Sequence, residues 1–302
     1  MYRILTALVF LVFVTTGSVC AATAGSVHTS EVDIATITLG TRGSATPLIA
    51  VNGGPGLSHA YMVQNDVWTR MATHGREVVL YDQRGTGKST RLRANAPQTM
   101  AAQVADLEAV RAKFGFATFD LVGDSYGGFL GMAYAIAHPN RIHKLVLSDS
   151  PSPKLDNIVH LLPQVYPDIE EEDAATQKRL GSTDAAAQAS LRNHFRMIFY
   201  SEAKRDAYLS HATDLGYNPK VGAAVSASAE KLDMTAQLHA FAFPTLIVTG
   251  RYDMNVAPLT AWRMYKAIPG AKLVIFEQSG HLPSYEEADK YVRVLRAFLD
   301  AK

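Results

Sequence analysis

One serine of the chain lies in a motif that can make a hydroxyl a nucleophile. Ser125 is the central residue of Gly123-Asp124-Ser125-Tyr126-Gly127, a G-x-S-x-G motif between an apolar run at 118–122 and a helical stretch at 126–137. A sharp strand-to-helix turn presents such a serine above a sheet, and only glycine leaves room two positions away on either side. The hydroxyl also lies at the positive end of the following helix. This context predicts a catalytic serine rather than an ordinary glycine-rich turn.

A serine hydroxyl is a weak nucleophile unless a histidine takes its proton and an acid orients that histidine. Two loops near the C-terminus supply these groups: the apolar run 245–249 leads to Asp253, and the run 272–276 leads to His281. In hydrolases with this turn, serine, acid and histidine follow one another in this order, each after a strand. We therefore predict Ser125, Asp253 and His281 as a catalytic triad.

Other aspartates compete for the role of the acid or adjoin the predicted site. Asp149 and Asp233 are the alternatives if Asp253 is not the acid. Asp124 directly precedes the nucleophile, but its side chain is expected to point away across the turn. Asp82 opens a separate motif. We expect both Asp124 and Asp82 to be structural.

Glycines after an earlier apolar run can bind the negative charge that develops during acyl transfer. The run 47–51 ends at Asn52-Gly53-Gly54-Pro55-Gly56. Backbone N–H groups there can face an oxyanion without a side chain in the way. We predict an oxyanion hole made by an N–H of Gly53 or Gly54 together with that of Tyr126, the residue after the nucleophile.

A second glycine-rich segment, at 82–89, superficially resembles a phosphate-binding loop. It reads DQRGTGKS, and its glycines Gly85 and Gly87 are too close together for the G-x-x-x-x-G-K-[ST] motif. Nucleotide binding is therefore not expected. The chain also has no H-E-x-x-H motif or comparable ligand cluster, so we predict no metal and no cofactor.

Short apolar runs alternate with longer amphipathic stretches along most of the chain. Strands are predicted at 31–39, 47–51, 77–81, 118–122, 144–147, 245–249 and 272–276, and helices at 99–114, at 126–137 and after each of the last two strands. Such alternation is typical of a mostly parallel sheet with helices on both faces. Together with the G-x-S-x-G turn it predicts the α/β-hydrolase fold.

The rhythm changes between 151 and 237, where the sequence is Ala-rich, polar and helical, without a buried-strand run. A segment of this length is too long for a simple loop. We predict a helical cap at 151–237 inserted between two parts of the hydrolase core, at 25–150 and 238–302.

The N-terminus is typical of a signal peptide. Arg3 precedes an apolar run at 4–14, and Ala22-Thr23-Ala24 fits an A-x-A cleavage site. The run is too short to span a bilayer, so residues 1–24 are predicted to be removed on export to the periplasm or medium, without a stable membrane anchor. Cleavage would also remove the only cysteine, Cys20, which the poor lipobox Gly17-Ser18-Val19 does not mark for lipidation.

Composition limits the classes of partner. The 302 residues carry a formal net charge of +1 without a Lys/Arg block, which disfavours nucleic acids and anionic membranes. Hydrophobic residues make up 48% and charged residues 19%, as in a globular protein with a real core. A small molecule or short peptide is the expected partner, and the oligomeric state stays open.

Five of these features together resemble the proline iminopeptidase family of α/β-hydrolase serine peptidases. They are GGPG at 53–56, DQRGTGKS at 82–89, GDSYGG at 123–128, the Asp253 loop, and Gly280-His281. The resemblance covers both parts of the core, at 49–149 and 243–299. Two positions depart from the family pattern: Asn52 stands where histidine is usual, and Tyr126 where tryptophan is frequent.

The resemblance implies a serine aminopeptidase that releases an N-terminal residue, often proline, from small peptides, amino-acid amides or arylamides. Members of the family hold the substrate ammonium with glutamates of the cap. Glu202, which follows the apolar patch 195–200, is the candidate here, whereas Glu230 is a weaker one and the acidic run 170–173 is expected to be a solvated face.

Two alternatives remain. A carboxylesterase would use the same residues on a neutral ester. A non-catalytic binding protein of the same fold would have no need of all three triad residues, so the intact set argues against it.

Overall fold

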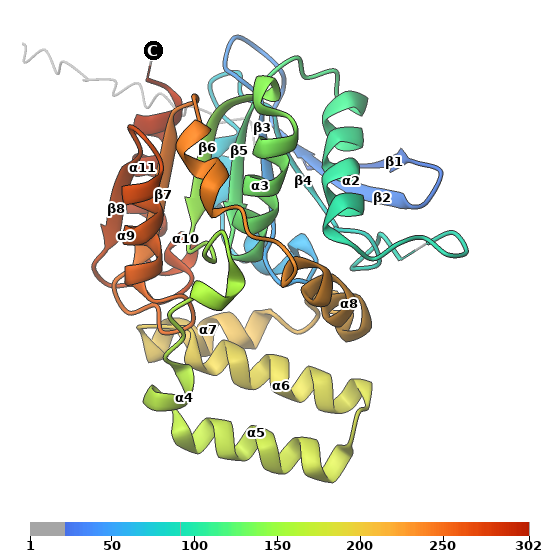
Figure 1. Ribbon diagram of the computed structural model, residues 1–302, viewed down its shortest axis with the longest axis vertical. Helices are drawn as coiled ribbons and strands as arrows, with labels where there is room; N and C mark the ends of the chain where they lie inside the picture. Colours follow the sequence, from blue (N-terminus) through green and yellow to red (C-terminus); the bar gives the residue numbers. More distant parts are fainter. Residues whose placement is uncertain (1–21, 91, 302) are drawn as a thin grey trace, which may run out of the picture.

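The computed structural model describes residues 22–90 and 92–301, and one eight-stranded sheet runs through it (Figure 1). Its strands, in the order of the chain, are β1 (Thr23–His28), β2 (Asp33–Leu39), β3 (Leu48–Val51), β4 (Val78–Tyr81), β5 (Phe119–Asp124), β6 (Ile142–Ser148), β7 (Thr245–Gly250) and β8 (Lys272–Phe276). The order in the sheet is β1-β2-β4-β3-β5-β6-β7-β8. β2 pairs antiparallel with β1 and β4, and all other neighbours are parallel. The predicted α/β-hydrolase fold is confirmed.

Helices cover both faces of the sheet. They are α1 (Val67–Met71), α2 (Met100–Lys113), α3 (Tyr126–Ala137), α9 (Pro258–Ala267), α10 (Pro283–Glu286) and α11 (Ala288–Leu299), with the 3-10 turns η1 (His59–Val63) and η2 (Pro139–Arg141). α2, α3 and α9 pack on one face, and α1 and α11 on the other. In β3, Ile49 and Val51 face the first layer while Leu48 and Ala50 face the second. Burial on both faces explains why the central strands are continuous apolar runs.

The segment between β6 and β7 contains only helices and 3-10 turns: η3 (Leu155–Asn157), α4 (Leu162–Val165), α5 (Pro167–Leu180), α6 (Asp184–Met197), α7 (Glu202–His211), α8 (Pro219–Ala229) and η4 (Thr235–Ala240). α4 to α7 extend beyond the sheet as a separate layer (Figure 1). α8 packs instead against α2, and its residues Val221, Val225 and Ala229 are part of the sheet's own core. The predicted cap at 151–237 therefore includes one helix that belongs to the core.

β1 was not expected from the sequence. Only Val27 of this strand is buried, so β1 lacks the alternation of a half-buried strand. Residues 1–21 of the predicted signal peptide lie outside the described residues. Thr23 and Ala24 pair with β2, and cleavage after Ala24 would remove only these two exposed residues from the strand. Cleavage and export stay predictions. No helix of the described residues is long and apolar enough to cross a membrane.

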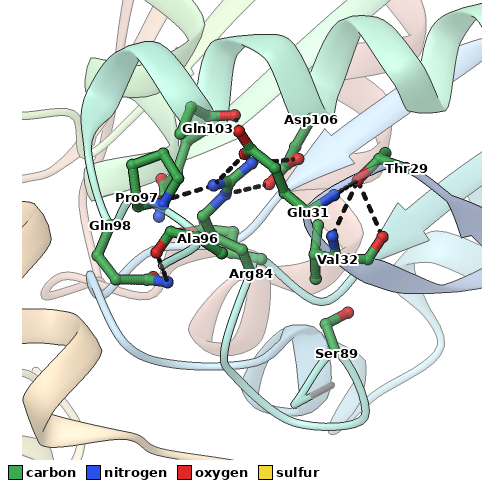
Figure 2. Close-up of polar contacts among 12 residues, drawn as sticks. Thr29, Glu31, Val32, Arg84, Ser89, Ala96, Pro97, Gln98, Gln103 and Asp106 are labelled. Atoms are coloured by element: carbon green, nitrogen blue, oxygen red, sulfur yellow. Dashed lines mark hydrogen bonds and ion pairs between the residues drawn. The ribbon is translucent and has the colours of Figure 1, made fainter. Parts of the chain in front are cut away.

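The segment 82–89 is anchored by a buried arginine (Figure 2). The Arg84 guanidinium donates two hydrogen bonds to the Asp106 carboxylate, at 2.6 and 2.7 Å, and one to the Glu31 carboxylate at 2.9 Å. A further bond reaches the backbone oxygen of Pro97 at 2.6 Å. A two-pronged pair of this kind fixes the arginine in one geometry. Arg84 thus ties the loop after β4 to α2 and to the β1–β2 turn, which gives this motif a structural reason.

Candidate active site

The structure brings the three predicted triad residues together. His281 Nε2 lies 2.9 Å from Ser125 Oγ, and His281 Nδ1 lies 2.7 Å from Asp253 Oδ2. The three side chains come from the ends of β5, β7 and β8, which meet at one edge of the parallel sheet. Asp253 is fully buried and His281 is only 4% exposed. This is the hydrogen-bonded order of nucleophile, base and acid that acyl transfer requires.

The nucleophile turn is held in a strained conformation. Ser125 has φ 51° and ψ −125°, and non-glycine residues rarely adopt such a positive φ. A Cβ atom at Gly123 would lie 2.4 Å from the Gly127 backbone oxygen, and one at Gly127 would lie 2.2 Å from that of Val51. Both glycines of the motif are therefore required by close backbone contact.

Asp253 is fixed by its own loop. Its Oδ1 atom accepts hydrogen bonds from the backbone N–H groups of Asn255, at 2.9 Å, and Val256, at 2.8 Å. Oδ2 is thereby directed at His281. Of the alternative acids, Asp233 is half exposed and pairs with Lys154 at 3.6 Å, away from His281. The prediction of Asp253 as the partner of the histidine agrees with this geometry.

Asp149 is buried close to the triad but bonds elsewhere. Its Oδ1 atom accepts from the Gly250 N–H at 2.9 Å, and its Oδ2 atom accepts from Ser148 Oγ at 3.1 Å. Burial, together with the charges of Asp253 and Asp124, raises the pKa of Asp149 well above its ordinary value. Because its two oxygens are bonded to Gly250 and Ser148, Asp149 does not compete with Asp253 for the histidine.

The pKa of His281 reflects opposing influences. Burial disfavours the charged ring and lowers the pKa, but the charge and hydrogen bond of Asp253 outweigh it, with a further contribution from Asp124. The net result is a pKa raised above the ordinary value of a histidine. A base of this kind accepts the serine proton readily and, once charged, is stabilised by the carboxylate behind it.

The two glycines predicted for the oxyanion hole differ in what their N–H groups do. The Gly53 N–H donates to Tyr61 Oη at 2.5 Å. No hydrogen bond from the Gly54 N–H occurs within residues 22–90 and 92–301, and Gly54 lines the cavity together with Ser125. Tyr126 begins α3, where an N–H has no intrahelical acceptor. Gly54 and Tyr126 therefore keep donors available to a ligand, whereas Gly53 does not.

A cavity of about 330 Å³ lies over the serine. Its floor comes from the core and includes Gly54, Ser125 and His281, and its roof is one face of α6. The α6 residues in this face are Ser190, Leu191, His194 and Phe195, and Ile198 follows directly after the helix. Burial and the charge of His281 lower the pKa of His194 to about 3, so this imidazole is neutral near pH 7. The roof is thus apolar and neutral-polar.

Two side chains at the site, Tyr61 and Asn255, were not predicted from the sequence, and a third, Asp124, lies elsewhere than expected. Asp124, expected to point away, lines the cavity and accepts a hydrogen bond from Tyr61 Oη, and Tyr61 lines the cavity as well. Asn255 Nδ2 lies 3.3 Å from His281 Nε2. The position of Asp124 beside the nucleophile was visible in the motif, but Tyr61 is distant from it in the sequence. Only the folded chain brings them together.

Glu202 is not brought to the cavity. It is the first residue of α7, its side chain is 85% exposed, and its nearest charged partner is Arg205 at 3.9 Å. Ser201 is the N-cap of this helix. The Glu202 carboxylate lies in the first turn, where it interacts favourably with the positive end of the helix dipole. This position does not support the predicted substrate-binding role of Glu202, which stays a prediction. Glu230, at the C-cap of α8, is also exposed.

A different carboxylate of the cap lies close behind the cavity wall. Asp173 belongs to the acidic run expected to be a solvated face, but it is half-buried between α5 and α6. Its two oxygens accept from Ser190 Oγ at 2.8 and 2.9 Å, and Asn193 Nδ2 donates at 3.3 Å. Ser190 lines the cavity, so Asp173 lies one side chain behind the wall.

Asp149, Asp253 and His281 lie close enough together for their ligand atoms to fall within 4.8 Å of one another. Two of these atoms are already hydrogen-bonded to each other at 2.7 Å, and Asp149 is bonded to the Gly250 N–H. The hydrogen bonds of these three residues therefore fit a catalytic triad better than a cation-binding site. The absence of a metal and of a cofactor stays a prediction.

Comparison with known proteins places the chain. The sequence profile of the alpha/beta hydrolase fold family matches residues 46–288. A proline iminopeptidase of Saccharolobus solfataricus is 30% identical over 274 residues, which cover 86% of each chain. One of Lactobacillus crispatus is 29% identical over 87% of this chain and 92% of its own length.

Solved structures agree on the fold. The proline iminopeptidase of Mycobacterium smegmatis superposes with a TM-score of 0.71 at 21% identity, over 92% of this chain and 98% of its own. An esterase of Exiguobacterium antarcticum superposes with a TM-score of 0.69 at 19% identity, over 89% and 96%. The chain therefore belongs to the α/β-hydrolase family, among members similar to the proline iminopeptidases.

Proposed function

We propose that this hydrolase is a serine aminopeptidase that works through an acyl-enzyme on Ser125 and releases the N-terminal residue of short peptides or amino-acid amides. The observation that carries the proposal is the chain of hydrogen bonds from Ser125 through His281 to Asp253, at 2.9 and 2.7 Å. The relatives named proline iminopeptidase support the peptidase part of it.

The proposed reaction has two halves. His281 Nε2 takes the proton of Ser125 Oγ while Oγ bonds to the substrate carbonyl carbon, and the oxyanion is bound by the N–H groups of Gly54 and Tyr126. The C–N bond then breaks, and His281 returns its proton to the departing amine. Water, deprotonated by the same histidine, attacks the acyl-enzyme and restores the serine. Asp253 stays ionised throughout.

An aminopeptidase must bind a free ammonium, which needs a counter-charge when it enters a closed pocket. With Glu202 in solvent, Asp173 is the carboxylate that fits this role, acting directly after a small shift of Ser190 or through the Ser190 hydroxyl. The Asp173 carboxylate is hydrogen-bonded to Ser190 of the cavity wall, so it is already oriented. We assign Asp173 as the proposed ammonium partner.

A carboxylesterase is the second candidate. It is favoured by one observation: the roof of the cavity has only apolar and neutral-polar side chains, since no carboxylate of the cap lines it directly. A neutral acyl group would fit such a roof without a counter-charge. A non-catalytic protein of this fold is excluded if an organophosphate labels Ser125.

The choice between peptidase and esterase is tested with matched substrates and variants. Aminoacyl arylamides with a free amine should be cleaved, and their N-acetylated forms should be cleaved much more slowly. Asp173→Asn should raise the barrier by about 2–5 kcal/mol, the cost of removing one partner of a desolvated charge pair.

Glu172→Gln is the matched control, because Glu172 precedes Asp173 but pairs with Arg196 on the surface. It should leave activity unchanged. The esterase would be favoured if the acetylated substrates were cleaved as fast as the free-amine forms or faster, or if only p-nitrophenyl esters were cleaved.

We also propose that the protein is exported after removal of residues 1–24. The support is the sequence pattern of Arg3, the apolar run and Ala22-Thr23-Ala24. N-terminal sequencing of the native protein should find Gly25 or a close neighbour. A retained Met1 would refute it.

A further inference from the structure

A tyrosine hydroxyl joins the oxyanion segment to the nucleophile turn. Tyr61 Oη accepts the Gly53 N–H at 2.5 Å and donates to the carboxylate of Asp124, the residue directly before Ser125. A phenol hydroxyl has one proton to donate and can accept at the same time, so one oxygen serves both segments. Tyr61 is 5% exposed and Asp124 2% exposed. Burial therefore protects the bridge from competing water.

The bridge lies where the two segments are in closest contact. A Cβ atom at Gly53 would lie 2.8 Å from Ser125 Cβ and 2.8 Å from Tyr61 Oη. The hydrogen bond to Tyr61 restrains the peptide immediately before the one that carries the Gly54 N–H. From the other side, Tyr208 Oη of α7 donates to the Tyr61 backbone oxygen at 3.1 Å. The Tyr61 backbone is thus bonded to the cap, while its hydroxyl joins two segments of the core.

We propose that Tyr61 and Asp124 are a positioning pair, which fixes the oxyanion segment against the nucleophile turn and places a second carboxylate near the catalytic histidine. Neither residue is assigned to bond making or proton transfer. The inference deepens the proposed acyl-transfer function and rests on it, because it presumes that Gly54 binds the oxyanion and His281 is the base.

Asp124 lines the same cavity as Ser125 and His281, so its charge can act on the histidine. Burial raises the pKa of Asp124 to about 6, although the Tyr61 hydrogen bond and the His281 charge favour its ionised form. In return, the Asp124 charge adds to that of Asp253 in raising the pKa of His281. Around neutral pH the pair therefore makes the histidine a stronger base.

Several groups act on Asp124 from the elements packed around it. The Asp253 charge opposes ionisation of Asp124, and the Asp124 charge in turn raises the pKa of Asp149. The remaining titratable neighbours are phenols, whose own pKa values are raised: Tyr61 of η1, Tyr208 of α7 and Tyr291 of α11. These phenols are neutral in the working range, so His281 is the only cation among the groups that face Asp124 in the described residues.

The positioning role is tested first with Tyr61→Phe. Loss of the hydroxyl frees the Gly53 peptide, and displaced oxyanion donors should lower kcat by about 10- to 100-fold with KM changed less than about 3-fold. Tyr134→Phe is the matched control, because Tyr134 is also buried and its Oη donates to a carboxylate, Glu108, at 2.6 Å, away from the site. It should reduce stability while kcat stays unchanged.

The electrostatic role is tested with Asp124→Asn. Asparagine keeps an acceptor for Tyr61 Oη and removes the charge, so the pKa of His281 should fall. His281 is active as a base only when neutral, and the acid limb of kcat/KM should therefore move to lower pH. The limb should also become steeper, because protons on Asp124 and His281 disfavour each other in the parent enzyme and spread its titration.

A merely structural role would lower the rate at every pH without moving the limb. An unmoved limb in Asp124→Asn, or a kcat loss in Tyr61→Phe no larger than in Tyr134→Phe, overturns the inference. If Asp124→Asn does not fold, Asp124→Ser removes the same charge with a smaller side chain. Organophosphate labelling of Ser125 distinguishes failure of this inference from failure of the proposed function. If the variants are still labelled, the serine mechanism stands even where the positioning role fails. If the parent enzyme is not labelled, the serine mechanism itself is refuted.

Discussion

The floor and the roof of the cavity are built in different ways. On the floor, Ser125 and Asp253 are each held by the turn that carries them: the Gly128 N–H donates to the Ser125 backbone oxygen at 2.8 Å, and Asp253 accepts two N–H bonds from its own loop. The roof is one helix face, α6, whose place depends on packing against other helices. Local turns thus fix the chemistry, and tertiary packing fixes what the site accepts.

The floor and the roof meet at the histidine loop. The His281 N–H donates to the Ile198 oxygen at 2.8 Å, directly after α6. Below this contact, the buried Glu286 carboxylate accepts from the Gly280 N–H at 2.7 Å and from the Ser201 N–H at 2.8 Å. A change on the floor should abolish the reaction, whereas a change at the junction or in the roof should have a graded effect.

The largest effect is expected for Ser125→Ala. The substitution removes one oxygen atom at the floor and should lower turnover on the order of 10⁶-fold with the fold intact, because no other group can form the acyl-enzyme. Turnover is measured with aminoacyl arylamides, and the integrity of the fold with the circular-dichroism spectrum. Near-normal turnover by folded protein would refute the mechanism.

Asp253→Asn should cost less, on the order of 10⁴-fold in kcat. The amide can no longer stabilise the charged ring or hold its reactive tautomer, but serine and oxyanion donors remain. Asp149→Asn is the comparison, since Asp149 is buried nearby without bonding to His281. A larger loss for Asp149→Asn than for Asp253→Asn would move the acid to Asp149.

The same contrast explains what could be predicted from the sequence. The triad followed from short motifs at strand ends, because parallel strands bring those ends to one edge. Asp173 and Tyr61 could not be found in this way, because their partners are distant in the sequence. Asp173 meets Ser190 only when α5 packs on α6, and Tyr61 meets Asp124 only when the segment after β3 folds over the nucleophile turn. Glu202 was chosen from its sequence neighbours alone, and the helix turned it outward.

The strand β1 was not predicted from the sequence for a related reason. Its residues are mostly exposed, so its place at the sheet edge depends on pairing with β2 and not on an apolar pattern. Edge elements of this kind leave little hydrophobic signal.

At the junction, Glu286→Gln should lower both stability and activity. The buried carboxylate binds backbone N–H groups of the histidine loop and of the cap, and hydrogen bonds to a charged group contribute about 1.5–3 kcal/mol each. The amide keeps one acceptor oxygen, so we expect a loss of about 2 kcal/mol in the free energy of unfolding, measured in urea.

Asp289→Asn is the control for this substitution, because the Asp289 side chain is 81% exposed and pairs with Arg70 at 2.8 Å. Its free energy of unfolding should stay within about 0.5 kcal/mol of the parent. If the Glu286 variant lost no more than this control, the cap would be held to the histidine loop by packing alone.

The smallest effect is expected for Glu202→Gln, and this result would sharpen the comparison most. The carboxylate lies in solvent at the start of α7, with Arg205 as its nearest partner at 3.9 Å, so neither kcat nor KM should change for substrates with a free amine. Asp173→Asn on the same substrates supplies the contrast, since both variants remove one cap carboxylate. A loss for Glu202→Gln equal to that for Asp173→Asn would mean that α7 turns toward the cavity when substrate binds. The roof would then be a moving element, and its selectivity could not be inferred from the face of α6 alone.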